Sequence, residues 1–348
     1  GRHRLVTHVV RNPPPVSLTE VSVTGVSEPV RGTPGHPVFI ARRPRRWISQ
    51  MAWNELEGGW AELRSARKGD YLLVPKRRDL PATELSPDLL YLMGWYLADG
   101  SITHGQLTVT FGQRERGCAK RIAAITTRYS RLHPTVWRSG HNGLHKHAAV
   151  AQVRHYARFT RVTIQNKWLS EFLVSTCGPA RNKCLSHELF KSAGLLPLAL
   201  GFLEGDGSQS KTRQDISVRQ RDGRLLEQIR QILLDGGIWC TELSPDNSGQ
   251  RGLDLPAPSV NTLLACCRSE RFHPVMRRDT RIVAYECPDG FWTPIRSVCN
   301  VPYDGPVFNL AVDEDNSYVA GGIAAHNCMA WLIALVTSNA EDYSRFTE

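Results

Sequence analysis

A motif that occurs twice constrains this chain more than any other feature of its sequence. The segments LMGWYLADG at 92–100 and ALGFLEGDG at 199–207 are both apolar, helix-like stretches that end in Asp-Gly. After each copy come a strand-like segment and a second helical segment. The two aspartates, Asp99 and Asp206, are 107 residues apart. A repeat on this scale predicts that the middle of the chain is a duplicated structural unit.

Small residues predict how the two copies meet. Gly94 and Ala98 lie about one helical turn apart on one face, and Gly201 and Gly205 do the same in the second copy. Small side chains at this spacing allow two helix backbones to approach closely. We therefore expect the two motif helices to pack against each other and to end at the same point.

Such packing brings two carboxylates together. Asp99 and Asp206 then lie side by side, each followed by a glycine that can cap its helix. Adjacent carboxylates repel each other unless a cation lies between them, and their hard oxygen atoms favour Mg²⁺. A pair of this kind can hydrolyse phosphodiester bonds by in-line attack. The alternative, that both Asp-Gly pairs are plain helix ends, explains a single copy better than two matched ones.

Positive charge is concentrated next to the first copy. The net charge is +10, but residues 101–183 hold 14 Lys and Arg against two acids, whereas residues 208–286 hold 12 against ten. A surface that is merely soluble mixes the two signs, so we interpret the basic segment as a nucleic-acid contact whose strength falls steeply with salt. The expected phosphate contacts are Arg114, Arg116, Arg138, Lys146, Arg154, Arg158 and Arg161.

The flanks of this region differ from it in character. Residues 1–80 and 281–327 read as short strands separated by Pro and Gly turns, whereas residues 81–280 alternate helical and strand-like windows. We expect a multidomain chain in which an all-β domain is interrupted by an α/β insert, followed by a final segment at 328–348. Nine cysteines without a CxxC pair indicate a reducing compartment. With no apolar run of membrane length, we expect a cytoplasmic monomer that does not contact membranes.

A reactive triplet, His326-Asn327-Cys328, closes the second strand-like flank. The Asn327 side-chain amide can attack its own carbonyl carbon, which forms a succinimide and breaks the next peptide bond. His326 can polarise that carbonyl or protonate the leaving amine, and the Cys328 thiol is a nucleophile that can accept an acyl group. Near the start of the chain, TPGHP contains Thr33 and His36, a motif that by itself reads as a turn.

The duplicated motifs resemble the signature helices of the LAGLIDADG homing endonucleases, over roughly residues 85–270. The resemblance implies an α/β endonuclease with two αββαββα repeats, whose four-stranded sheets form a saddle over double-stranded DNA. It makes Asp99 and Asp206 the ligands of a shared Mg²⁺. It also places Glu204 on the other acidic position of the signature, where the first copy has Leu97.

The same resemblance gives Lys183, in NKCLSHELF, a catalytic role. The family often carries a lysine shortly before its second signature, and this lysine is thought to stabilise charge or to organise the attacking water. A plain phosphate contact explains Lys183 equally well. The counterpart of Lys183 in the second half would be Arg277 or Arg278.

The flanks resemble an intein, a protein-splicing element of the all-β Hint fold. TPGHP is similar to the family's TxxH block, LRSARKGDYLLVP to its GD segment, and AAHNC to its C-terminal splice junction. The resemblance implies that Thr33 and His36 destabilise an upstream scissile bond and that His326 assists the cyclisation of Asn327. Cys328 would then be the first residue of the downstream host segment, or C-extein.

Three positions depart from the intein pattern. The chain begins with Gly1 in place of a Cys, Ser or Thr nucleophile, so we expect the opening splice block to be missing and complete self-splicing not to occur. Asn309 stands where the family often has Asp, and Asn316 stands where it often has His. Both put the rate of Asn cyclisation in question.

Three functional hypotheses remain. The first is an intein fragment that carries an Mg²⁺-dependent homing endonuclease, which would cut an intein-free copy of its host gene. The second is a DNA-binding LAGLIDADG-like module without nuclease activity, and the retention of Asp99 and Asp206 argues against it. The third is a free-standing endonuclease or intron maturase, against which the AAHNC junction argues.

Overall fold

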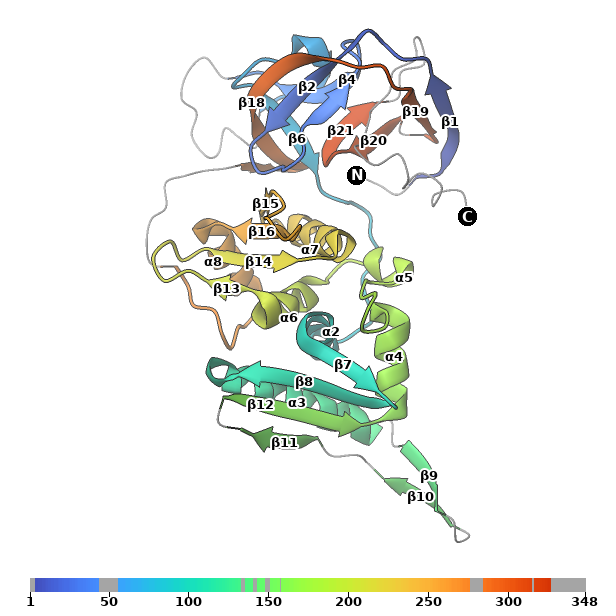
Figure 1. The fold of residues 1–348 in the computed structure, drawn as a ribbon, viewed down its shortest axis with the longest axis vertical. Helices are drawn as coiled ribbons and strands as arrows, with labels where there is room; N and C mark the ends of the chain where they lie inside the picture. Colours follow the sequence, from blue (N-terminus) through green and yellow to red (C-terminus); the bar gives the residue numbers. More distant parts are fainter. Residues whose placement is uncertain are drawn as a thin grey trace. The chain divides into compact units, whose positions relative to one another are not determined.

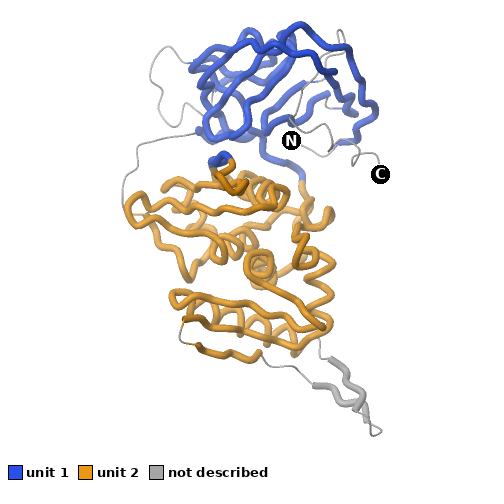
Figure 2. The backbone as a smooth tube through the Cα atoms, viewed as in Figure 1, with its two compact units in different colours: residues 1–79, 241–244, 279–348 blue, residues 80–240, 245–278 orange. Residues whose placement is uncertain are grey.

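The computed structural model divides the chain into two compact units (Figure 2). The first comprises Gly1–Asp79, Thr241–Ser244 and Asp279–Glu348, and the second comprises Leu80–Cys240 and Pro245–Arg278. The structure describes residues 4–43, 56–132, 135–139, 143–147, 151–156, 158–275, 284–314 and 316–326, and of 135–139 and 143–147 only the backbone.

The first unit is built around one large antiparallel sheet (Figure 1). Its strands lie in the order β20-β21-β4-β6-β18-β2-β3, with β5 paired to β4 and β17 paired to β18, and β1 forms a separate pair with β19. The bounds are β1 (Val6–Asn12), β2 (Ser17–Val23), β3 (Val30–Gly32), β4 (Pro37–Ala41), β5 (Gly59–Glu62), β6 (Tyr71–Pro75), β17 (Tyr285–Cys287), β18 (Gly290–Pro302), β19 (Val307–Val312), β20 (Ser317–Ala320) and β21 (Ile323–His326). A short 3-10 turn, Leu63–Ser65, follows β5.

The long strand β18 joins the two halves of this sheet. Its first residues pair with β6 and its later residues pair with β2, and the register shifts at Ile295. Apart from Thr241–Ser244, the chain leaves this unit after β6 and returns to it before β17, and Pro75 and Gly290 are directly opposite each other in the ladder. The α/β segment is therefore inserted between two neighbouring strands of one sheet.

The inserted segment, residues 80–278, contains two repeats with the same element order, helix–strand–strand–helix–strand–strand–helix. The first repeat consists of α2 (Pro87–Asp99), β7 (Gly100–Thr103), β8 (Gln106–Gly112), α3 (Arg116–Leu132), β11 (Gln152–His155), β12 (Phe159–Gln165) and α4 (Lys167–Cys177). The second consists of α6 (Leu196–Asp206), β13 (Ser208–Gln209), β14 (Ile216–Gln220), α7 (Gly223–Asp235), β15 (Thr241–Leu243), β16 (Arg251–Leu255) and α8 (Ala257–Cys266). The short helix α5 (His187–Phe190) lies between the repeats, and the hairpin β9 (Thr135–Ser139) and β10 (Gly143–His147) is specific to the first repeat.

The two sheets confirm the duplication at the level of topology. Their strand orders, β11-β12-β8-β7 and β13-β14-β16-β15, are the same pattern read from opposite ends. The sequence expectation of a helix–strand–helix repeat is met, and the full αββαββα order is present twice. Among the described residues, no helix combines the length and the apolar character that a membrane crossing requires.

The motif helices lie at the centre of the second unit because they are apolar on every side. Residues 89–97 of α2 and 198–204 of α6 are all buried. Helix α2 begins at Ser86, whose hydroxyl accepts a hydrogen bond from the Leu89 N–H at 3.2 Å, with Pro87 at the first helical position. The amphipathic helix α3 packs on strands β8 and β12, and α7 packs on β16, so each sheet keeps its other face polar.

Candidate active site

The motif helices α2 and α6 pack against each other along their small residues, as the sequence predicts. A Cβ atom added to Gly94 or to Gly201 would come within 3.0 Å of the backbone of the opposite helix. A Cβ atom added to Gly205 would come within 3.0 Å of the Ala98 methyl group. The backbones therefore approach so closely that these glycines leave no room for a side chain.

Each motif helix ends at its aspartate, and the following glycine caps it. The Gly100 N–H donates to the Tyr96 carbonyl, and the Gly207 N–H donates to the Leu203 carbonyl. Both glycines have extended backbones with negative φ, so a left-handed conformation is not what requires glycine here. A Cβ atom at either position would come within 3.0 Å of the preceding helical turn, so space is the reason.

The packing brings Asp99 and Asp206 close enough for their charges to interact. Burial raises the pKa of Asp206 to about 6, and the negative charge of Asp99 acts in the same direction. Burial also raises the pKa of Asp99, while the positive charges of Lys183 and Arg271 oppose that rise. Both carboxyl groups are thus destabilised in their ionised form, which is the state in which a cation would bind them.

Lys183 lies against the end of the first motif helix. Its ammonium group donates to the Gly100 carbonyl at 2.8 Å and to the Ala98 carbonyl at 3.3 Å, and it lies 5.1 Å from the centre of the Tyr96 ring. Burial lowers the pKa of Lys183, and the charges of Asp206 and Asp99 oppose that shift. The residue singled out from the sequence therefore lies beside both carboxylates.

Arg271 occupies the corresponding place in the second repeat. Its guanidinium donates to the Glu204 carbonyl and, at 3.4 Å, to the Gly205 carbonyl, so it caps α6 as Lys183 caps α2. The sequence reasoning missed Arg271 and named Arg277 and Arg278, which lie outside the described residues. Its position after the last helix of its repeat, as Lys183 follows α4, is the signal that could have identified it.

Gln220 is a second residue that the sequence reasoning missed. Its side-chain amide donates to the Asp206 carboxylate. In the first repeat Ser101 pairs with Thr108, and in the second Ser208 pairs with Ser217. Three residues beyond the pairs, Phe111 corresponds to Gln220. The two aspartates therefore have different surroundings, and a search for matched residues in the two copies could not reveal this hydrogen bond.

The donor set fits Mg²⁺ that is shared with a phosphate-bearing substrate. Within the described ranges, no group of three or more His, Cys, Asp and Glu side chains could hold a metal ion. Mg²⁺ typically takes one or two protein carboxylates and completes its shell with water and substrate phosphates. Asp99 and Asp206 supply two carboxylates whose mutual repulsion a divalent cation would relieve.

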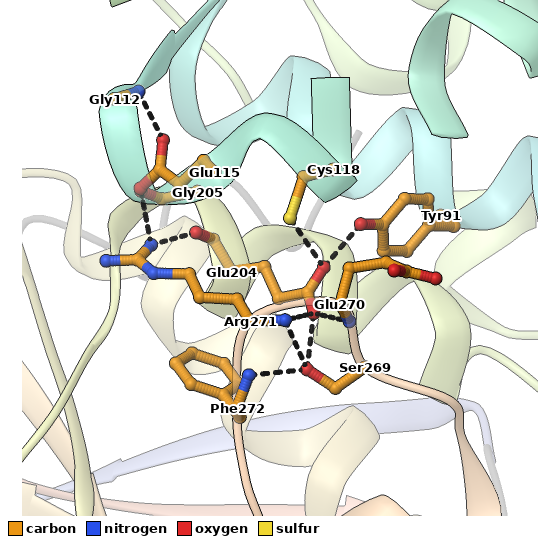
Figure 3. Close-up of polar contacts among 10 residues, drawn as sticks. All are labelled: Tyr91, Gly112, Glu115, Cys118, Glu204, Gly205, Ser269, Glu270, Arg271 and Phe272. Atoms are coloured by element: carbon orange, nitrogen blue, oxygen red, sulfur yellow. Dashed lines mark hydrogen bonds and ion pairs between the residues drawn. The ribbon is translucent and has the colours of Figure 1, made fainter. Parts of the chain in front are cut away.

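Glu204, the other acidic position of the second motif, lies in a buried hydrogen-bond cluster (Figure 3). One carboxylate oxygen accepts from the Ser269 hydroxyl and from the backbone N–H groups of Glu270 at 2.8 Å and Arg271 at 3.1 Å. The other accepts from the Tyr91 hydroxyl and the Cys118 thiol. Glu204 is fully buried, so it belongs to the support of the site.

The uncovered face of the first sheet is polar and basic. Cross-strand pairing places side chains on this face, which we call the basic face and define as Ser101, Thr108, Thr110, Gln152, Arg154, Arg161 and Thr163. No acid occurs among these residues. On the corresponding face of the second sheet, Asp254 pairs with Ser217. The sign of the charge thus favours the first sheet as a phosphate-binding surface.

The seven expected phosphate contacts are not all in one place. Arg154 and Arg161 are direct cross-strand partners on the basic face, and both are exposed. Arg161 lies 5.8 Å and 5.5 Å from the rings of Tyr156 and Phe159, which stack on each other. Arg158 is exposed in the turn between β11 and β12.

The remaining candidates lie elsewhere in the first repeat. Arg114 is exposed in the turn between β8 and α3, and Arg116 is exposed at the first position of α3. Arg138 is in β9 and Lys146 is in β10, where the structure describes the backbone only. These four residues are therefore placed on the first repeat but not on the basic face.

The expected splicing residues gather in the first unit. Thr33 and His36 form a turn closed by the His36 N–H, which donates to the Thr33 carbonyl at 2.9 Å. His36 is fully buried, and burial lowers its pKa to about 4, with His326 acting in the same direction. The imidazole is therefore neutral near pH 7. The Thr33 Oγ1 and His36 Nδ1 atoms are buried, and the described residues offer them no hydrogen-bond partner.

His326 ends strand β21, and its ring lies 4.8 Å from the Trp60 ring, centre to centre. The Tyr318 hydroxyl lies 3.5 Å from His36 Nε2 and 3.4 Å from the Asn309 carboxamide oxygen. Sequence reasoning did not single out Tyr318. Asn327 and Cys328 lie outside the described residues, so the structure places His36 and His326 near each other without placing the bond they would act on.

Comparison with known proteins identifies relatives but no matching family. No protein-family model matches the chain. It is 25% identical over 339 residues to iron-sulfur cluster assembly SufBD family proteins of Mycobacterium bovis and Mycobacterium tuberculosis. The alignment covers 91% of this chain and 36% of each relative. The chain thus spans about a third of the length of these curated relatives.

Solved structures with similar parts include a DNA-cutting enzyme. The homing endonuclease I-DmoI in complex with DNA and Mn is 15% identical, with a TM-score of 0.37, over 53% of this chain and 98% of that one. Full-length DUF199/WhiA from Thermatoga maritima is 15% identical, with a TM-score of 0.35, over 55% of this chain and 58% of that one. The fold of the second unit is established by its own repeat topology and not by these likenesses.

Proposed function

We propose that the second unit is a LAGLIDADG-type homing endonuclease that hydrolyses phosphodiester bonds of double-stranded DNA with Mg²⁺. The observation that carries the proposal is the convergence of Asp99 and Asp206 at the ends of two helices in backbone contact. A helix pair that ended in these residues for packing alone would not need two neighbouring, mutually repelling carboxyl groups.

The residues around the pair have separable roles in such a reaction. Asp99 and Asp206 would hold Mg²⁺, which when bound would supply Lewis-acid polarisation of the scissile phosphate. Lys183 and Arg271 provide positive charge on either side of the point where the phosphate gains negative charge during attack. The amide of Gln220 fixes the orientation of the Asp206 carboxylate.

The basic face would hold the DNA next to this centre. Arg154 and Arg161 are paired across β11 and β12, so they present two guanidinium groups side by side to a backbone. The hydroxyl and amide side chains along the same rows can donate to phosphates or read base edges. The excess of positive charge in the first repeat favours it as the stronger of the two DNA-binding halves.

A selection from random DNA tests the proposal. The full-length chain is incubated with Mg²⁺ and a plasmid library with randomised inserts, and linearised plasmids are sequenced. We expect sequence-specific linearisation that EDTA abolishes and that Asp206→Asn slows by at least about a hundredfold. Arg128→Gln is the control. Arg128 forms an ion pair with Asp88 at 2.7 Å and is not one of the residues around Asp99 and Asp206. Sequence-specific binding without cleavage would instead support the DNA-binding module.

We further propose that the first unit is a Hint-type splicing domain that can cleave the peptide bond after Asn327. The supporting observation is the proximity of His36, buried and neutral, to His326, the residue that precedes that asparagine. A neutral imidazole can accept and return the protons that cyclisation and amine departure require.

The intact mass of the freshly purified chain tests this second proposal. Loss of residues 328–348 from the parent, but not from an Asn327→Ala variant, is the expected result. Retention of the full mass by the parent under native conditions, with the first unit folded, would contradict it. The measurement is independent of DNA cleavage.

The SufBD relatives suggest what such an element interrupts. The matched stretch is 36% of each relative, so most of the sequence of those proteins lies outside it. The assembly function in their names can belong to that remaining sequence. We attribute the stretch that resembles this chain to an inserted splicing element and the assembly function to the remaining sequence. For the present chain we therefore propose DNA cleavage and peptide-bond cleavage, not iron-sulfur assembly.

A further inference from the structure

Each repeat holds one positively charged side chain beside its motif helix, Lys183 in the first and Arg271 in the second. The two repeats use different residues to hold it there. In the second repeat the buried position before Gly205 carries Glu204, while the matching position of the first repeat carries Leu97. A buried carboxylate is costly unless donors surround it. An acid at one copy only therefore indicates a task that the first repeat accomplishes in another way.

The five donors of Glu204 divide into two groups (Figure 3). The Tyr91 hydroxyl and the Cys118 thiol come from the first repeat, and burial raises the pKa of both groups, so each keeps its proton and donates. The Ser269 hydroxyl and the N–H groups of Glu270 and Arg271 come from the segment after α8. One carboxylate therefore ties that segment to the helix that ends in the aspartate.

Arg271 is the last residue of the segment that the Glu204 carboxylate holds. Its N–H is held by the Glu204 carboxylate, and its guanidinium turns back to the main-chain carbonyls of Glu204 and Gly205. Among the described residues, Glu115 is the only acidic residue whose side chain forms an ion pair with this guanidinium, at 3.0 Å. Glu115 is itself fixed by the Gly112 N–H at 2.7 Å.

Ser269 strengthens the same turn. Its hydroxyl donates to Glu204 and accepts from the N–H groups of Arg271 at 3.1 Å and Phe272 at 2.7 Å. The backbone on both sides of Arg271 is thus specified by hydrogen bonds that lead back to one carboxylate. The side chain of Arg271 has little freedom at its root, which is how a charge is preorganised.

The first repeat reaches the same end without a carboxylate. There the Tyr96 hydroxyl donates to the Gly178 carbonyl at 2.7 Å, which ties the segment after α4 to the motif helix. Lys183 follows in that segment and caps the helix through Ala98 and Gly100. Tyr96 is therefore the counterpart in role, one position earlier in the motif.

We propose that Glu204 is a positioning residue: its buried carboxylate fixes the backbone at Ser269–Arg271 and thereby holds the Arg271 guanidinium at the end of α6, beside Asp99 and Asp206. The geometric part stands by itself, whereas its catalytic consequence rests on the proposed endonuclease function. Glu204 acts through Arg271 and does not touch the substrate.

Hydrogen exchange in the free, full-length chain tests the geometric part. In Glu204→Leu, which installs the residue that the first repeat carries, the amide protons of Glu270 and Arg271 should exchange at least about tenfold faster. Tyr96→Phe is the matched control, because it removes the tie of the first repeat and should leave these two amides unchanged. Unchanged exchange in Glu204→Leu would overturn the proposal.

Ser269→Ala covers the case in which Glu204→Leu does not fold. This change deletes one donor and leaves the carboxylate in place, so the same two amides should exchange faster by a smaller factor. Slow exchange in Ser269→Ala equal to that of the parent would count against the attachment. Neither measurement requires DNA cleavage, so failure of the endonuclease proposal is recognised separately by an inactive parent.

Single-turnover cleavage of a duplex recovered by the selection tests the catalytic part. Glu204→Leu and Arg271→Gln should each slow cleavage by roughly tenfold or more without weakening DNA binding. The double variant should be no slower than Arg271→Gln, because Glu204 has nothing left to position. Effects that multiply, or a loss of DNA affinity in place of rate, would show that Glu204 has a merely structural role.

Discussion

At the residue scale, burial favours the neutral form of the acid and of the base alike. It raises the pKa of Asp206 to about 6 and lowers the pKa of His36 to about 4. Both residues therefore change charge in the same pH range, but with opposite effects on stability. Each effect can be isolated by comparing the parent with a variant that cannot titrate at that position.

Asp206→Asn should stabilise the chain at neutral pH. The folded pKa of about 6 lies above the ordinary 3.8, so the folded state binds more protons and stability falls as pH rises from 3.8 to 6. The variant escapes this loss. In urea unfolding we expect a gain of about 1–2 kcal/mol above pH 6 that disappears below 3.8.

The control is to repeat the measurement with saturating Mg²⁺. A cation between the carboxylates should stabilise the parent and not the variant, which would narrow or reverse the difference. A gain that is independent of both pH and Mg²⁺ would show that Asp206 is not destabilised by its charge.

His36→Gln should change the acid side of the stability profile. The folded pKa of about 4 lies below the ordinary 6.5, so stability that is present above 6.5 is lost as pH falls toward 4. The variant should lack this slope, which corresponds to about 2–3 kcal/mol in the parent. Parallel pH profiles for parent and variant, measured by urea unfolding, would contradict the burial of a neutral imidazole.

At the scale of elements, the contact between α2 and α6 is the one that admits the least change. Gly201→Ala places a methyl group within 3.0 Å of the α2 backbone, so the helices must move apart. We expect a loss of about 1–3 kcal/mol in the free energy of unfolding. Cleavage should fall further than stability explains, because the same shift separates Asp99 from Asp206.

Gly223→Ala is the control for this change. It lies at the start of α7, where a Cβ atom meets only the Arg251 side chain at 3.4 Å. Alanine should be neutral or slightly stabilising there. Equal losses from both alanine substitutions would refute the close-contact explanation.

The first sheet makes its own prediction about DNA. Arg154→Ala and Arg161→Ala should each lower the salt slope of binding to a random-sequence duplex by about one, because each removes one phosphate contact. Arg219→Ala in the second sheet should change it less, since Arg219 already lies 3.7 Å from Asp246. Filter binding at several salt concentrations measures all three slopes, and equal slopes would reject the basic face as the main contact.

At the scale of the whole molecule, the features that the sequence could predict are those that occur in both repeats. The helices ending at Asp99 and Asp206, and their glycine contact, follow from matched spacing alone. Arg271 could be found only by its place after the last helix of its repeat, because its residue type differs from that of Lys183. Gln220 could not be found by matching the copies, because the first copy has Phe111 in the corresponding place, and Gln220 reaches Asp206 through a tertiary contact that no local pattern records.

In the β-rich flanks, the sequence predicts the individual strands but not how they pair. Their strands show as short apolar runs, but the pairing of β18 with both β6 and β2 joins residues far apart in the sequence. Strands β20 and β21 form a hairpin, which Gly321 and Gly322 turn with positive φ. Periodicity identifies strands, whereas register depends on partners that are brought together only in the fold.

The pairing of Pro75 with Gly290 has a consequence for the history of such a chain. Apart from the short strand β17, everything between these two residues is one loop of the sheet, and the entropic cost of closing a loop grows only with the logarithm of its length. A loop that folds into a domain with neighbouring ends costs less still. The inserted domain can therefore be gained, shortened or lost in evolution while the sheet is kept. It could also be replaced by another domain at the same insertion point.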